Sequence, residues 1–275
     1  PILKQMMRPM ALMARELDPT RMILDESGGW AFGARIYLPY KFEPTRFNDI
    51  HNYPGPFVNE QLFNGLLTIG MTDQEKKELG LNVQTPGRNV VPGLMSFVSE
   101  LGYGSLPNLV KINEQFRREG NPKLPAFRYH HRLEKDQMRV LKESGFDRLY
   151  PDLEQFCLDQ QSIHGAANKR MIEAVRANPN VNGYCIHALS AGDWILGAGL
   201  IDLWRNPKSY AYDGTKAANQ PQILVIRMSP RNVYAERNST IEITGVNEFK
   251  SVPATLTVQV VSADGNNVYH EQVEL

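Results

Sequence analysis

The chain of 275 residues is long enough for one α/β domain of barrel size, or for a smaller domain with an appended module. Its 30 lysines and arginines balance 30 aspartates and glutamates, so net charge indicates neither a nucleic-acid partner nor an anionic membrane surface. No apolar run approaches the roughly 20 residues that span a bilayer, so no membrane partner is expected. Cys157 and Cys185 form no CxxC pair and are expected to be buried thiols.

The first residues predict an amphipathic helix, because apolar side chains recur at spacings of three and four from Leu3 to Leu17. Methionines dominate this stripe, and flexible thioethers fill irregular gaps, so we expect the stripe to pack in the core. Asp18-Pro19 ends the helix. Pro1 leads directly into this pattern without an initiator methionine or a signal peptide. We therefore interpret the chain as part of a longer polypeptide, and its compartment stays open.

Short apolar segments that end in polar and aromatic residues then recur along the chain. They are residues 22–24, 49–53, 95–101 and 181–189, and each fits a strand better than a helix. Helical patterns follow or separate them at residues 72–80, 109–119, 129–142 and 152–177, the last with a break near Gly165. This alternation predicts a parallel sheet or barrel. In such folds the carboxyl ends of the strands carry the chemistry.

The segment from Met95 to Leu101 is the most informative of these strands. It lies between Pro92-Gly93 and Gly102, which predicts a buried parallel strand with Glu100 at its carboxyl end. In the segment before it, His51 and Tyr53 alternate onto one side of an extended backbone, so both can face a pocket. The alternatives are a solvated Glu100 at a strand terminus and a histidine bonded to neighbouring backbone.

Several kinds of site find no support in the sequence. The pair His130-His131 has no carboxylate or thiol at metal-ligand spacing, so no metal site is predicted. A phosphate-binding loop, a GxSxG elbow and a complete GxGxxG motif are all missing, so no nucleotide cofactor is expected. What remains is carboxylates and aromatic residues at successive strand ends, a combination that suits sugars.

From Pro221 the sequence changes to short runs of β-branched residues. These runs are residues 223–226, 239–244 and 254–260, and Asp264-Gly265-Asn266 is a hairpin turn signal. They predict an incomplete antiparallel β-sandwich over residues 220–275, after an α/β region over residues 1–219.

Four segments together resemble glycoside hydrolase family two, whose members include β-galactosidases, β-mannosidases and β-glucuronidases. Residues 99–107 look like the family's nucleophile motif, and residues 49–55 and 181–194 are similar to its sixth and eighth barrel strands. Residues 17–21 resemble the link from its fourth helix to its fifth strand. The resemblance implies part of a (β/α)8 TIM barrel, strands five to eight, followed by the start of an immunoglobulin-like β-sandwich.

The resemblance also implies a function. It is that of a retaining, β-galactosidase-like exo-β-glycosidase that hydrolyses terminal β-linked sugars without a cofactor or metal. Glu100 would attack the anomeric carbon and form a glycosyl-enzyme. The subsite for the terminal sugar would be shaped by His51, Tyr53, Tyr103, Asp193 and Trp194.

One departure from the family is as informative as the match. The family's acid/base glutamate lies in an Asn-Glu pair just before the helix with which this chain begins, and that pair is absent. Asn59-Glu60 and Asn113-Glu114 contain the dipeptide, but each lies in a helix-like run after the wrong strand. Glu26 ends a strand, yet it fits the fifth strand rather than the fourth. The fragment alone is therefore expected to be nearly inactive.

Two other hypotheses stay open. In the first, the fragment is a non-catalytic carbohydrate-binding or scaffold piece, and the missing acid/base residue is the reason to consider it. Alternatively, two copies pair to cover the open edges of the half-barrel, because uncovered parallel strands are an aggregation hazard. The partner in that case is a second copy or the remainder of the polypeptide.

Overall fold

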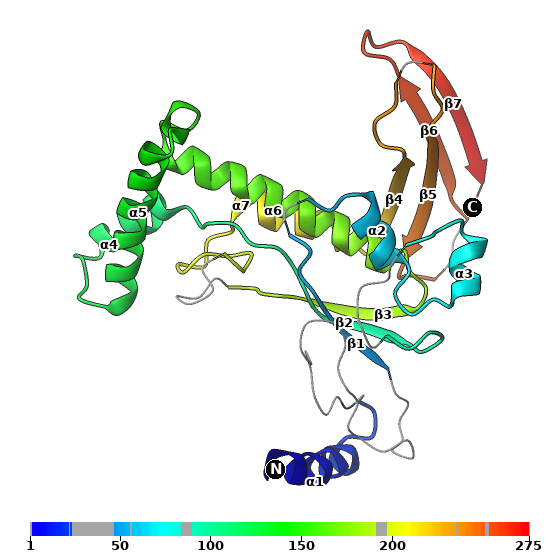
Figure 1. Ribbon diagram of the computed structural model, residues 1–275, viewed down its shortest axis with the longest axis horizontal. Coiled ribbons are helices and arrows are strands. Elements are labelled where there is room, and N and C mark those ends of the chain that lie inside the picture. The colour runs from blue at the N-terminus through cyan, green and yellow to red at the C-terminus, as the bar shows by residue number, and fades with distance from the viewer. Residues whose placement is uncertain are drawn as a thin grey trace.

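The computed structural model describes residues 2–21, 23, 47–55, 57–83, 90–190, 197–234, 236–250 and 253–274. The fold is mixed α/β, with one parallel sheet followed by two antiparallel strand pairs (Figure 1). None of the helices in these ranges is long and apolar enough to cross a membrane.

The parallel sheet consists of β1 (Asn48–Asn52), β2 (Ser96–Leu101) and β3 (Val181–Ile186), with β2 in the middle. Strands β1 and β2 are joined by α2 (Glu60–Leu67) and α3 (Asp73–Glu78). Strands β2 and β3 are joined by α4 (Leu109–Arg118), α5 (Pro125–Glu143), the 3-10 turn η2 (Phe146–Arg148) and α6 (Leu153–Arg176). Helix α7 (Ser209–Ala218) follows β3. The predicted strand–helix alternation is therefore confirmed over these elements.

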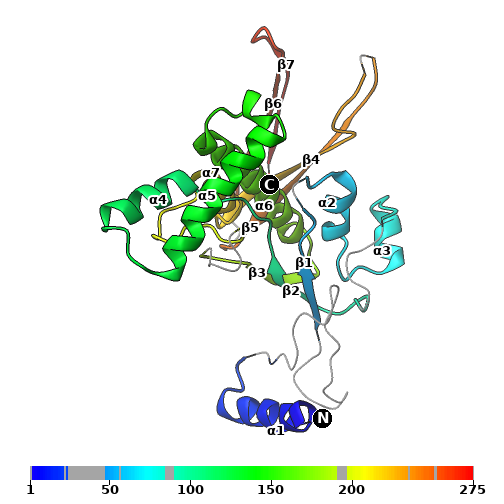
Figure 2. The same ribbon diagram turned by 60° about the vertical axis from the view of Figure 1, so that its left-hand side comes forward.

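A closed barrel is not formed by the described residues, which supply three parallel strands. The strand predicted at residues 22–24 falls outside them, apart from Ile23. Helices α2, α6 and α7 cover one face of the sheet (Figures 1 and 2). Their apolar side chains meet those of the strands in one buried cluster, which includes Ile50, Val98, Leu101, Phe63, Leu66, Met171 and Ile172. Burying such side chains stabilises the fold by about 1.5–3 kcal/mol each.

Local capping explains several helix starts. Thr72 and Glu75 form a reciprocal capping box at α3, in which each side chain accepts a backbone N–H of the other. Asn108 accepts the Lys111 amide at the start of α4, and Asp152 accepts the Glu154 amide at the start of α6. Each capping residue lies within three residues of the amide that it bonds, so the sequence around each helix start is enough to specify it.

The break predicted near Gly165 does not occur, because α6 is one continuous helix of 24 residues. Gly165 instead lies where α6 crosses α7 at very close range. A Cβ atom at Gly165 would lie 2.1 Å from the Tyr210 carbonyl oxygen, and one at Gly214 would lie 2.5 Å from the Gly165 carbonyl oxygen. The glycine pair allows the two backbones to touch, and tertiary packing offsets the low helix propensity of glycine.

Two burial expectations are wrong. In α1 (Ile2–Leu17) the side chains of Met6, Met10 and Met13 are exposed, because the helix lies apart from the sheet and the other helices (Figures 1 and 2). Cys157 is buried as expected, and burial raises the pKa of its thiol to about 11. Cys185 is exposed, because its neighbours Tyr184 and Ile186 on β3 pack against the core cluster, and its own side chain therefore points to the opposite face of the sheet.

The β-rich tail has the predicted strands. It contains β4 (Gln222–Ser229) paired with β5 (Thr240–Asn247), and β6 (Thr255–Val261) paired with β7 (Asn267–Glu274), both antiparallel. Gly265 takes a φ of +87° in the turn between β6 and β7, as the turn signal predicts. The described strands form two separate pairs, and a closed sandwich stays a prediction.

An arginine ties this tail to the α/β region. The buried Arg176 guanidinium donates 2.6 Å hydrogen bonds to the carbonyl oxygens of Ala218 and Gln220 and forms an ion pair with Glu248. Farther along, Arg227 on β4 donates to the Asn64 side chain on α2 at 3.1 Å. These hydrogen bonds add to an apolar contact, since Val225 on β4 is buried in the same core cluster as the sheet and its helices.

The glycine crossing predicts a measurable stability effect. Gly165→Ala is expected to lower the free energy of unfolding by about 1–3 kcal/mol, because the added methyl group meets rigid backbone atoms. Urea denaturation followed by circular dichroism measures this change. Gly245→Ala on β5 is the matched control, since a Cβ there meets nothing within 4 Å, and it should stay within about 0.5 kcal/mol. Equal effects of the two substitutions would contradict the proposed close contact.

Candidate active site

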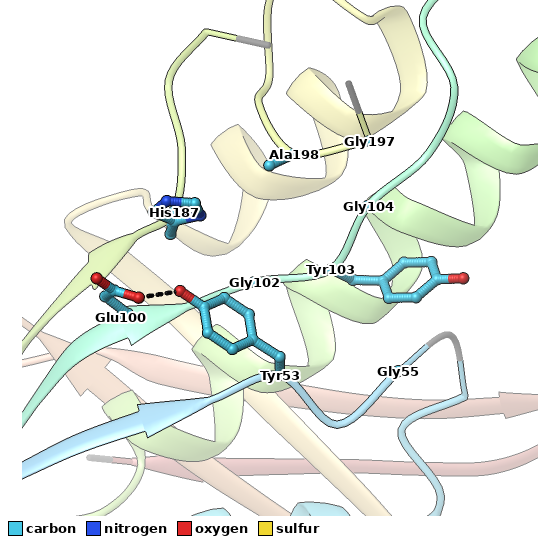
Figure 3. Close-up of a pocket in the computed structure, with 9 residues that line it drawn as sticks. All are labelled: Tyr53, Gly55, Glu100, Gly102, Tyr103, Gly104, His187, Gly197 and Ala198. Atoms are coloured by element: carbon cyan, nitrogen blue, oxygen red, sulfur yellow. Dashed lines mark hydrogen bonds between the residues drawn. The ribbon is translucent and has the colours of Figure 1, made fainter. Parts of the chain in front are cut away.

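A cleft of about 680 Å³ opens at the carboxyl ends of the parallel strands (Figure 3). It receives residues from the ends of all three strands and from the segments that follow them. The lining residues are Tyr53, Gly55, Glu100, Gly102, Tyr103, Gly104, His187, Gly197 and Ala198. Parallel strands place their carboxyl ends at one edge of the sheet, so residues far apart in the chain meet there.

Glu100 is held at this edge by two donors from β1 and the residue that follows it. The Tyr53 hydroxyl donates a hydrogen bond to Oε2 of Glu100, and Nδ1 of His51 lies 3.1 Å from the same oxygen. His51 pairs directly with Glu100 in the β1–β2 register, next to an irregularity in the ladder. Because a carboxylate only accepts hydrogen bonds, Nδ1 of His51 carries the proton here. Both donors meet Oε2, so Oε1 receives neither of these two bonds.

The surroundings of Tyr53 keep its hydroxyl protonated. Burial, followed by the hydrogen bond to Glu100 and the negative charge of that carboxylate, raises the pKa of Tyr53 well above its ordinary value. The phenol therefore remains a donor across the physiological pH range. Its ring also meets the His187 ring edge to face, with 5.8 Å between centroids. The side chain of Glu100 stays 36 % exposed and so is open to a ligand.

The far wall of the cleft is backbone rather than side chain. A Cβ atom at Gly102 would lie 2.6 Å from the His187 carbonyl oxygen, and one at Gly104 would lie 3.0 Å from the carbonyl carbon of Gly197. The His187 amide donates to Leu101 at 2.9 Å, and the Ser105 amide donates to Gly197 at the same distance. Glycines are required because the two segments touch, and their missing side chains leave the cleft open.

The remaining predicted site residues have different positions. Tyr103 lines the cleft, but its ring points away from Glu100 (Figure 3) and meets the buried His164 ring edge to face, 5.9 Å between centroids. Its amide donates to the Asn168 side chain on α6 at 3.1 Å. Asp193 and Trp194 lie outside the described residues, so their predicted roles stay predictions.

His187 is a cleft residue that sequence reasoning missed. It lies just after β3, within the segment predicted as a strand up to residue 189, and its ring contacts Tyr53. The available signal was its place at the end of a strand next to the Glu100 strand. That signal was weak, because a single histidine in an apolar run has many structural uses.

A second carboxylate is not found among the described residues that line the cleft. Asn59 caps α2 by accepting the Leu62 amide at 2.9 Å, and Glu60 accepts a hydrogen bond from Ser229. Asn113 is buried in α4 and donates to Glu134 and to the carbonyl oxygen of His130. Neither Asn-Glu dipeptide lines the described cleft, and both asparagines are engaged in hydrogen bonds within their own part of the fold. Glu26 lies outside the described residues.

The described part of the chain also contains no cluster of three or more His, Cys, Asp or Glu residues that could hold a metal ion. The chemistry available in the described cleft is therefore that of an oriented carboxylate with phenol, imidazole and backbone groups around it.

Comparisons with known proteins find a distant structural likeness. No protein-family model and no curated protein sequence matches the chain. Among solved structures, it is similar to a β-D-mannosidase from Dictyoglomus thermophilum, with 18 % sequence identity and a TM-score of 0.45. The likeness covers 82 % of this chain and 25 % of that enzyme, so the chain spans about a quarter of the enzyme's length. A likeness this distant assigns no activity, so function must be inferred from the cleft itself.

The contact between Glu100 and Tyr53 predicts a titration effect. Glu100→Gln should lower the pKa of Tyr53, because the substitution removes the carboxylate charge. The value should remain above that of a solvated tyrosine, since burial is the largest cause of the shift. Titration of ring-labelled tyrosine by NMR measures the change, and Tyr53→Phe assigns the signal. Glu114→Gln is the control and should leave the Tyr53 titration in place. An unchanged Tyr53 in Glu100→Gln would refute the hydrogen bond.

Proposed function

We propose that this chain carries the nucleophile side of a retaining exo-β-glycosidase site, with Glu100 as the nucleophile. The observation that carries the proposal is the carboxylate at the strand ends, held through one oxygen by Tyr53 and His51 and facing a 680 Å³ cleft. The cleft is large enough for a sugar ring, since ligand sites commonly measure about 300–1,000 Å³. Residues 1–219 would belong to a TIM-barrel catalytic domain and residues 220–275 to the next β-sandwich.

The chemistry follows from this geometry. Oε1 of Glu100 attacks the anomeric carbon, the bond from that carbon to the leaving oxygen breaks, and a glycosyl-enzyme ester forms. Tyr53 and His51 hold Oε2, so the attacking oxygen keeps one orientation and reacts without searching rotamers. A general acid protonates the leaving oxygen, and as a base it later takes a proton from the water that releases Glu100.

The acid/base carboxyl group is the missing part. It is not among the described residues that line the cleft. Without it, Glu100 should become glycosylated only by substrates whose leaving group departs without a proton. His51, Tyr53 and His187 would contact the sugar directly or through Glu100. Tyr103 would contribute its backbone, and Asp193 and Trp194 would complete the subsite.

A second candidate function is carbohydrate binding without turnover. It is favoured by the observation that Glu100 is the one carboxylate among the described cleft residues. Calorimetric titration with methyl β-glycosides, together with hydrolysis assays on aryl β-glycosides, separates the two. Binding with no trace of turnover, even of activated substrates, favours this alternative.

The decisive experiment is covalent labelling. The chain is incubated with 2-deoxy-2-fluoro β-glycosides that carry a dinitrophenolate leaving group, across the galacto, manno and gluco series. Dinitrophenolate departs without protonation, so the acid/base residue is not needed, and the fluorine slows the release of the glycosyl-enzyme. Mass spectrometry should find one fluorosugar on the peptide that contains Glu100.

Two variants make the outcome specific. Glu100→Gln should lose the label completely, because an amide does not attack the anomeric carbon. Glu114→Gln, at a partly exposed position on α4 outside the Glu100 cleft, should be labelled as the original chain is. A label on another residue, or a label that persists in Glu100→Gln, rules out Glu100 as the nucleophile.

A further inference from the structure

A buried lysine lies behind the backbone wall of the cleft. Lys208 precedes the first residue of α7 and is 2 % exposed. Its Nζ donates a 2.6 Å hydrogen bond to the carbonyl oxygen of Ser105 and a 3.0 Å bond to that of Gly197. Lysine is almost never fully buried without a partner charge, so this position calls for an explanation.

The two carbonyl groups belong to the two segments that form the cleft wall. Ser105 follows Gly104 after β2, and Gly197 lies in the segment after β3, next to Ala198. The Gly197 carbonyl already accepts the Ser105 amide at 2.9 Å, so it receives two donors. The lysine therefore links the same two backbone segments that the glycine contact brings together.

The neighbours of Lys208 give it no full counter-charge. Within the described residues it forms no ion pair, and its hydrogen bonds go to carbonyl oxygens. The nearby Asp202 carboxylate accepts hydrogen bonds from the backbone amides of Trp204 and Asn206 at 2.8 Å, and these bonds stabilise the turn that Asp202 begins. On α6, burial raises the pKa of Cys157 to about 11, so its thiol stays neutral at physiological pH.

The other titratable groups around it are accounted for as well. His164 on α6 bonds Ser105 through Nδ1 at 2.9 Å, and burial, followed by the charge of Lys208, lowers its pKa to about 3. That imidazole is neutral across the physiological range. On its other side Lys208 borders a second cleft of about 520 Å³, whose charged residues include Lys111, Glu114 and Arg118 of α4.

We propose that Lys208 is a positioning residue for the cleft, whose buried amino group joins the carbonyls of Ser105 and Gly197 and so sets the wall that a bound sugar meets. Lys208 does not line the cleft and touches no ligand; it acts through the backbone of the two glycine segments. Removing its amino group leaves the Ser105 carbonyl without this donor in a buried place, and the wall relaxes.

The protonation state of Lys208 should change near neutral pH. Burial lowers its pKa to about 7, and the negative charge of the nearby Asp202 carboxylate offsets part of this shift. Between this value and the ordinary lysine value of about 10.4, the unfolded chain binds more protons than the folded one. The free energy of unfolding should therefore rise with pH across that window. Below about pH 7 both states hold a charged lysine, so the Lys208 contribution stays flat there.

The first test does not depend on any activity. The amide signals of Gly104, Ser105 and Gly197 are followed by NMR in the whole chain between about pH 5 and 9. A common step near pH 7 is expected, and Lys208→Met, which removes the amino group at similar length, should abolish it. Lys216→Met, at an exposed position on the same helix, is the matched control and should keep the step.

Each result decides the matter. Flat signals in the original chain, or a step that persists in Lys208→Met, overturn the proposal. If Lys208→Met fails to fold, NMR titration of the Lys208 side-chain carbon next to Nζ in the original chain shows whether the step of the three amides has the same midpoint as Lys208, and different midpoints overturn the proposal. The free energy of unfolding provides a second test. Its rise above about pH 7 should be present in the original chain and in Lys216→Met and absent from Lys208→Met.

The second test rests on the proposed function. The rate of Glu100 labelling by the activated fluoroglycoside should fall roughly tenfold in Lys208→Met, the effect of about one lost hydrogen bond on the wall, and should not change in Lys216→Met. An unchanged rate in folded Lys208→Met overturns the positioning role. If the original chain is not labelled at all, the proposed function has failed, and the NMR titration still decides the role of Lys208.

Discussion

The close approach of two backbone segments is the constraint on which the rest of the site depends. Gly102 and Gly104 follow β2 and touch the segment at His187 and Gly197 that follows β3, at distances that leave no room for a Cβ atom at Gly102 and little room at Gly104. This contact forms the wall of the cleft and directs Ser105 toward His164 and the Lys208 amino group. A side chain at Gly102 would have to push the two segments apart next to the strand end where Glu100 is held.

Glu100 itself shows how a parallel sheet builds a site from distant pieces. The register sets His51 directly opposite Glu100, and Tyr53, two residues later, points the same way and reaches the same carboxylate oxygen. Tyr53 then contacts His187 from the third strand end. Residues from β1 and its end therefore orient the Glu100 carboxylate. The contact between the Tyr53 and His187 rings then connects this side of the cleft to the end of β3.

The packing behind the sheet has the same character as the cleft wall. At the α6–α7 crossing Gly165 and Gly214 let two helices touch, and this brings the start of α7, and with it Lys208, against the cleft wall. The polar link through Arg176 then fixes the start of the β-rich tail to the end of α6. Close backbone contacts and buried polar side chains, more than apolar packing alone, determine where the functional groups lie.

The sequence by itself determined the local elements: Thr72 and Glu75 cap their helix within one turn, Asp264-Gly265 makes its hairpin, and an apolar run between glycines makes the Glu100 strand. It also indicated that Glu100, His51 and Tyr53 lie at strand ends. Only the tertiary structure decided that Gly165 continues its helix, that the α1 methionines and Cys185 are exposed, and that the Tyr103 ring turns away (Figure 3). It also decided that His187 lines the cleft and that Lys208 bonds the carbonyl groups behind the cleft wall. The reason is physical: capping and periodicity act between neighbours in the chain, whereas burial, helix crossing and side-chain orientation depend on partners that are distant in sequence.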